Sequence, residues 1–160
     1  MNGGSGLADA LPSVRARLKR NRSELLAPRD VGSLVLPASP NTSLAAPDGF
    51  RPTADLVSPR YAVSARKLYA VLRTIAAAQP RTTLDAAFDE ALQAHYTVRS
   101  ALLGFPDLGW VQALSSGPDR SEALIWSRSV VGRHDFGINR ARVQAWLAAI
   151  GAALQTRGER

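Results

Sequence analysis

The chain has 160 residues, 46% of them hydrophobic and 21% charged, a balance typical of one globular domain with a tail and not of a disordered chain. It contains no cysteine, which excludes disulfides, thiolate zinc sites, iron–sulfur clusters and cysteine nucleophiles. The net charge is +7, but the arginines are spread along the chain among acids, so the charge permits nucleic-acid binding without predicting it.

Residues 1–26 form a basic amphipathic N-terminal segment in which apolar residues recur at helical spacing. One interpretation is a helix that docks on a membrane surface or a partner protein. The other is a solvated tail helix or the remnant of a targeting segment. Pro12 interrupts the pattern and shortens any helix there. The apolar positions are Leu7, Leu11, Val14 and Leu18, and the basic residues of the docking interpretation are Arg15, Arg17, Lys19 and Arg20.

Residues 27–59 are rich in proline, which cannot donate a hydrogen bond to a strand ladder and breaks helices. We therefore expect extended, irregular chain laid over the domain surface.

Residues 60–155 predict an α+β domain, and residues 156–160 a flexible tail. Ser64 can cap a helix whose apolar face includes Leu68 and Leu72, and Gln79-Pro80 ends it. A second helix closes the domain and buries Val143, Trp146, Leu147, Ile150 and Leu154. The predicted strands cover residues 61–63, 82–87, 95–103, 109–114 and 123–131.

The resulting order, β-α-β-β-β-β-α, predicts an antiparallel curved sheet with the helices packed on one face. By analogy this order is similar to the folds of the TATA-binding-protein and helix-grip types. A shared fold does not define a function.

Three stretches of the chain resemble the domain of unknown function 1499 family. The most specific is residues 127–143, a Ser/Arg-rich strand followed by a glycine and by Asp135-Phe-Gly-Ile-Asn-Arg-Ala-Arg-Val at the start of the last helix. Residues 99–107 resemble the family's strand and turn, and Ser39-Pro40-Asn41 resembles its Ser-Pro-Asn motif. The resemblance covers about residues 27–154.

The sequence departs from this family at several positions. Many members have cysteines where Leu36 and Thr42 stand, and an arginine near the position of Val130. A thiol role or a cluster built on that arginine is therefore not expected here. Many members also begin with a membrane anchor, in whose place the basic segment 7–26 stands.

The residues around the start of the last helix have two interpretations. Asp135 and Asn139 can cap the free N–H groups of the helix, so the block can be a stiff strand-to-helix turn tied to Asp107 by arginine. Alternatively, a helix N-terminus beside arginines favours an anion or a polar headgroup. The candidate binding residues are Arg99, Asp107, Asp135, Asn139, Arg140 and Arg142.

Further residues carry alternatives. His134 and Asp135 could orient a general base, with Asp107 nearby, although adjacent residues seldom point together as a triad requires. The acidic run at Asp85, Asp89 and Glu90 could serve hydrolysis or a metal, but such a run is more often a solvated strand edge. The tryptophans Trp110, Trp126 and Trp146 either pack in the core or line an apolar pocket between sheet and helix.

These observations favour a non-enzymatic binding or assembly protein that docks on a protein complex or membrane surface and holds a small apolar ligand. The alternatives are an enzyme using His134, Asp135 and Asp107, and a basic nucleic-acid-binding protein, which the dispersed charge disfavours. No dinucleotide-binding or P-loop pattern is present and only two histidines occur, so we predict no cofactor and no metal. Without an apolar run long enough to span a bilayer or a clear secretory signal, we expect a soluble or peripheral protein.

Overall fold

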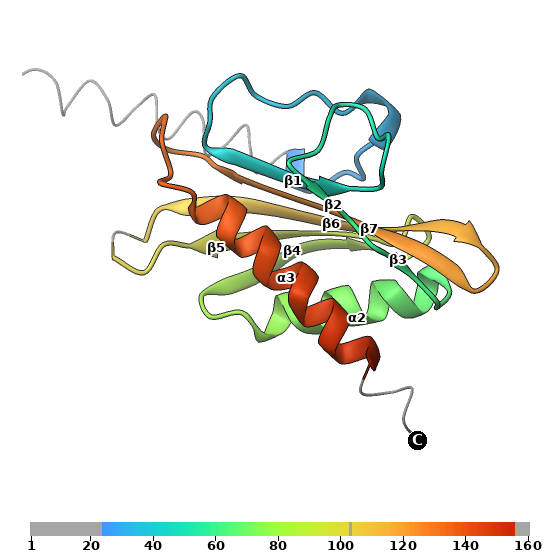
Figure 1. The fold of residues 1–160 in the computed structure, drawn as a ribbon. Coiled ribbons are helices and arrows are strands. Elements are labelled where there is room, and N and C mark those ends of the chain that lie inside the picture. Colours follow the sequence, from blue (N-terminus) through green and yellow to red (C-terminus); the bar gives the residue numbers. More distant parts are fainter. Residues whose placement is uncertain (1–23, 103, 156–160) are drawn as a thin grey trace, which may run out of the picture.

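The computed structural model describes residues 24–102 and 104–155 of the chain. Figure 1 shows a twisted sheet with both long helices on one face and the chain before β2 over the other. Of the predicted N-terminal segment 1–26, only residues 24–26 are described, so its basic residues lie outside the described ranges. The predicted tail at 156–160 lies outside them as well.

The elements, in chain order, are the 3-10 helix η1 (Val31–Ser33), strands β1 (Thr42–Ala46), β2 (Leu56–Val57) and β3 (Arg60–Tyr61), helix α2 (Ala65–Ala78), strands β4 (Thr82–Phe88), β5 (Gln93–Arg99), β6 (Pro106–Gly117) and β7 (Arg120–Ser129), and helix α3 (Ile138–Gln155).

The sheet has seven strands, with β2-β1-β7-β6-β5-β4 as its main path and β3 paired with β7. Strands β4 to β7 form an antiparallel meander, and β1 adds to it antiparallel to β7. The short pairing of β1 with β2 is parallel. The predicted α+β class and antiparallel sheet with the helices on one face are therefore confirmed.

The sequence predicted irregular chain over residues 27–59. The structure instead has strands β1 and β2 in this range. Prolines flank β1 at positions 40 and 47 and lie outside its ladder, so they do not interrupt its pairing. The strand itself, Thr-Ser-Leu-Ala-Ala, lacks the β-branched and aromatic residues that mark most strands, apart from its first residue. Its small side chains instead suit a position buried between β7 and β2.

Helix α2 begins where the sequence predicts, because the Ser64 hydroxyl accepts a hydrogen bond from the Lys67 N–H at 3.3 Å. Its apolar stripe and that of α3 cover the sheet and form the main core. Trp146 of α3 lies edge-on to Tyr96 of β5, with ring centroids 6.3 Å apart. Gly109 of β6 lies beneath this indole, and a Cβ there would be 3.8 Å from it, at ordinary van der Waals distance.

The opposite face of the sheet is covered by chain, not by a helix. Trp110 and Trp126 are directly paired on β6 and β7 and pack there with Leu34 and Leu44. The Arg29 guanidinium lies 5.0 Å from the Trp126 ring, in cation–π contact. Both faces of the central strands are thus buried, which explains their nearly continuous burial.

Candidate functional site

Asn139, in the first turn of α3, is the centre of a buried polar network. Its side-chain oxygen accepts hydrogen bonds from the Ser127 hydroxyl at 2.6 Å and from Arg142 at 2.9 Å. Its amide nitrogen donates to the Ser129 hydroxyl at 2.9 Å and to the Asn41 carbonyl at 3.1 Å. The residue is fully buried, so every bond of this side chain replaces one to water.

Asp135 caps the start of α3. Its carboxylate accepts hydrogen bonds from the N–H groups of Gly137 at 3.0 Å and Asn139 at 2.9 Å, and from the Asn139 side chain at 2.7 Å. Burial by itself raises the pKa of Asp135, but these hydrogen bonds outweigh it and hold the pKa below its ordinary value. The helix N-terminus that could attract an external anion therefore already holds an internal carboxylate.

Arg142 and Asp107 form an ion pair between α3 and β6, with Nη2 2.7 Å from Oδ2. Their side chains are 13% and 9% exposed, so this pair is shielded from solvent. Nη1 of Arg142 donates a hydrogen bond to the Ser127 hydroxyl at 2.8 Å. The predicted pairing of an arginine with Asp107 is thus present, and Arg142 makes it.

Asn41, just before β1, brings the Ser-Pro-Asn motif into the same network. Its side chain donates to the Gly132 carbonyl and accepts a hydrogen bond from the Ser39 hydroxyl. Its own carbonyl accepts from the Ser129 N–H at 2.9 Å. The three stretches singled out in the sequence therefore meet at one place, where the network joins β1, β6, β7 and α3.

Beside this network lies a pocket of about 310 Å³, bounded by α3, the turn after β5 and the connection from α2 to β4. Its wall combines an apolar part with cationic side chains. The apolar part includes Val98, Ile138 and Trp146, and the cations are Arg81, Arg99 and Arg142.

The charge of this pocket is unbalanced. Asp107 pairs with Arg142, whereas Arg81 and Arg99 form no ion pair with any residue in the described ranges. Arg81 Nε donates to the Arg99 carbonyl at 3.1 Å, and Arg99 Nη1 donates to the Gly104 carbonyl at 3.1 Å. These bonds hold the two exposed side chains beside the pocket, and no carboxylate of the described residues neutralises their positive charge.

Trp146 lines the pocket and also carries a buried polar atom. The residue is 1% exposed and lines the pocket, and its indole Nε1–H has no acceptor among the described residues. A buried donor without a partner costs roughly 1–3 kcal/mol.

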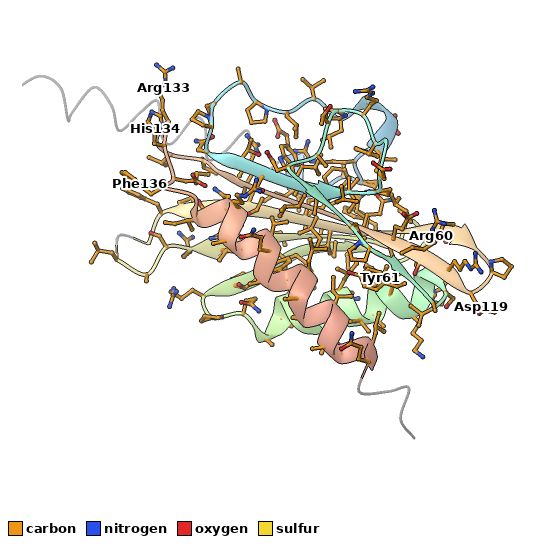
Figure 2. The ribbon with its side chains drawn as sticks, viewed as in Figure 1. Arg60, Tyr61, Asp119, Arg133, His134 and Phe136 are labelled. Carbon is orange, nitrogen blue, oxygen red and sulfur yellow. The ribbon has the colours of Figure 1, made fainter. Side chains whose placement is uncertain are left out.

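The structure separates several residues that the sequence grouped as one site. Arg140 turns away from the pocket and lies 3.5 Å from the Asp55 carbonyl. Trp110 and Trp126 lie on the face of the sheet opposite Trp146, so the three tryptophans do not line a common pocket. Figure 2 shows His134 on the loop between β7 and α3, where it points outward.

The acidic run also serves local contacts. Asp85 sits at a bulge of β4 and accepts a hydrogen bond from Thr97 at 2.8 Å. Asp89 accepts from Tyr69 at 3.0 Å and pairs with Arg73 at 3.3 Å. The pKa of Tyr69 is raised to about 12, chiefly by burial and to a smaller extent by Asp89. Within residues 24–102 and 104–155, no three histidines or acids are grouped to hold a metal ion.

Sequence reasoning missed Arg81 as a pocket residue. It follows Gln79-Pro80 and has a left-handed backbone with φ of +56°. Nothing in the sequence indicates that an arginine adopts this conformation. The role of Ser127 and Ser129 was missed as well, since the sequence indicates them only as part of a motif. The sequence does not indicate that the side chains of these two serines face the first turn of α3.

The fold and the polar network define an α+β protein whose last helix is joined to an antiparallel sheet through buried polar side chains. Residues 35–150 match the family described as a protein of unknown function, DUF1499, and the chain belongs to that family. None of the curated proteins compared with the chain matches it. In the described part of the chain, no helix is both long and apolar enough to cross a bilayer.

Proposed function

We propose that this protein is a non-enzymatic binding protein whose pocket holds a small molecule with an apolar body and an anionic end. The observation that carries the proposal is an apolar wall beside the cations Arg81 and Arg99, which form no ion pair with the described part of the chain. At about 310 Å³ the pocket is at the small end of the usual range for ligand sites. A carboxylate or phosphate would meet two guanidinium groups, and a short apolar chain would lie against Trp146 and Val98.

Binding is better supported than catalysis by the groups nearby. The carboxylates of Asp107 and Asp135 are already engaged by Arg142 and by N–H groups of α3. Among the described contacts, none joins His134 to either carboxylate. A general base has to face its substrate, whereas the hydrogen bonds of these two carboxylates aim them at Arg142 and at the first turn of α3.

The test is an NMR titration of the full chain with octanoate, followed through the indole N–H signals of the tryptophans. Trp146 lines the pocket, while Trp110 and Trp126 lie across the sheet and act as internal controls. We expect the Trp146 signal, assigned with Trp146→Phe, to shift selectively. Octanol lacks the charge and acetate lacks the chain, so each should bind more weakly. Equal shifts with octanoate and octanol, or no selective shift of Trp146, would contradict the proposal.

Charge-removing variants sharpen this test. Arg81→Gln and Arg99→Gln should each weaken octanoate binding about tenfold, since a hydrogen bond to a charged group contributes roughly 1.5–3 kcal/mol. Arg120→Gln removes the same charge from the β6–β7 hairpin, far from the pocket lining, and serves as the matched control. Arg142 is not used because its substitution would also break the buried network.

A further inference from the structure

The pocket is bordered by two turns that expose large apolar side chains to solvent. Leu102, in the β5–β6 turn, is 91% exposed, and Phe136, just before α3, is 96% exposed. Phe105 and Ile138 beside them are about half exposed, at 46% and 52%. Both turns adjoin the pocket, because Ala101 from one and Ile138 from the other line it.

The backbone before α3 holds Phe136 outward at a cost. Phe136 has φ of +53° and is followed by Gly137 at +79°, so two successive residues have a left-handed conformation. For a bulky residue this conformation is rare and unfavourable. Figure 2 shows the Phe136 side chain projecting from the loop at one end of the molecule, the end opposite Asp119. Neither the conformation nor the exposure of this ring stabilises the fold, and strained residues of this kind cluster at functional sites.

Cationic side chains accompany these apolar ones. Arg81 and Arg99 lie at the pocket itself, and Arg133 is exposed on the same loop as Phe136. Two acids at the start of β6 and before α3, Asp107 and Asp135, are occupied within the buried network. Apolar side chains at the tips of turns, surrounded by unbalanced arginines, complement the interface of a bilayer that contains anionic lipids.

We propose that this rim, defined as Leu102, Phe105, Phe136 and Ile138 with Arg81, Arg99 and Arg133, docks the protein on an anionic membrane surface. The apolar side chains enter the interface, the arginines meet the headgroups, and the mouth of the pocket faces the lipid. The ligand class that follows, an anionic lipid or fatty acid taken from that surface, rests on the proposed function of the pocket. The docking itself rests on the exposed rim.

The test is sedimentation of the full chain with phosphatidylcholine vesicles, with and without phosphatidylglycerol, at low and high salt. The double variant Leu102→Ser/Phe136→Ser removes the two most exposed side chains of the rim. The matched control, Val35→Ser/Val57→Ser, removes two side chains that are 82% and 62% exposed and do not line the pocket. Melting temperatures of both variants check that they are folded.

We expect the wild-type chain and the control to bind the phosphatidylglycerol vesicles alike, and more weakly at high salt. The rim variant should bind at least about tenfold more weakly, because it lacks the two apolar side chains that would be buried in the bilayer interface. Equal loss in both variants, or none in either, would overturn the proposal and assign any membrane binding to another part of the chain, such as residues 7–26. Absence of binding by the wild-type chain would overturn it as well.

A second measurement separates this proposal from the function of the pocket. Leu102 and Phe136 do not line the pocket, so the rim variant should bind octanoate as the wild type does. If octanoate never shifts Trp146 but the vesicle pattern holds, the ligand proposal fails and docking stands. If octanoate binds but rim and control variants sediment alike, docking fails and the ligand proposal stands.

Discussion

The side-chain amide of Asn139 donates a hydrogen bond to the main-chain carbonyl of Asn41, which lies 98 positions earlier, at 3.1 Å. This contact joins the first turn of α3 to the residue that precedes β1. Because Asn139 is fully buried, the first strand and the last helix share one polar centre. The conformation of the strand-to-helix loop depends on that centre, and so does the position of the pocket wall contributed by α3.

Replacing Asn139 by alanine should lower the free energy of unfolding by about 2–4 kcal/mol, because several buried partners would be left without a hydrogen bond. Urea denaturation measures the effect. Gln144→Ala, an exposed substitution on the same helix, is the control and should change stability by less than about 0.5 kcal/mol. A similar small effect at both positions would mean that the network does not stabilise the fold.

Removing Arg142 should leave the Asp107 carboxylate buried and unpaired. We expect Arg142→Met to cost about 3–5 kcal/mol of unfolding free energy. The double variant Asp107→Leu/Arg142→Met should recover a large part of that loss, because no lone charge then remains inside. Denaturation of the two single variants and the double variant gives the coupling energy. Simple additivity of the single effects would show that the pair does not act as a unit.

The hydrogen bonds to Asp135 predict acid sensitivity. Its folded pKa is below the ordinary value of 3.8, so the folded protein binds fewer protons than the unfolded chain in acid. The stabilisation is complete above pH 3.8 and is lost as the pH falls through the lower folded pKa. Asp135→Asn should flatten this acid branch of the stability curve, whereas Asp119→Asn, in the exposed hairpin, should leave it unchanged. Parallel acid branches for all three proteins would refute the assignment.

His95 predicts a second pH dependence on the other face of the sheet. Its ring is fully buried, with Nδ1 2.8 Å from the Leu25 carbonyl and Nε2 2.8 Å from Gln93. The pKa of His95 is lowered, chiefly by burial. The hydrogen bond to the Leu25 carbonyl raises this pKa, and the positive charge of Arg29 lowers it further.

The unfolded chain therefore takes up a proton near pH 6.5 that the folded protein does not, and stability is lost as the pH falls through 6.5. Unfolding free energies measured about one pH unit above and one below that value test this. The loss should be smaller in His95→Gln than in the wild type, and His134→Gln, an exposed substitution, should retain the wild-type loss. If His95→Gln loses as much stability as the wild type, His95 is not the titrating group.

Local patterns in the sequence determined most of the elements. The Ser64 cap and the apolar stripes of α2 and α3 each depend on residues within a few positions of one another, so they could be read from the chain. The resemblance of residues 127–143 to a family also pointed to the part of the chain where the polar network lies. For the same reason, Asp107, Asp135, Asn139 and Arg142 were predicted as one group.

Only the tertiary structure decided how those elements serve one another. Strand β1 has small side chains of low strand propensity, and pairing with the distant β7 makes it a strand. Trp110 and Trp146 look equivalent in the sequence, yet the fold places them on opposite faces of the sheet. Arg81 reaches the pocket through a left-handed turn, and Arg140 points elsewhere although it is close to Arg142 on the same helix. Such outcomes depend on packing between distant segments, which no local pattern encodes.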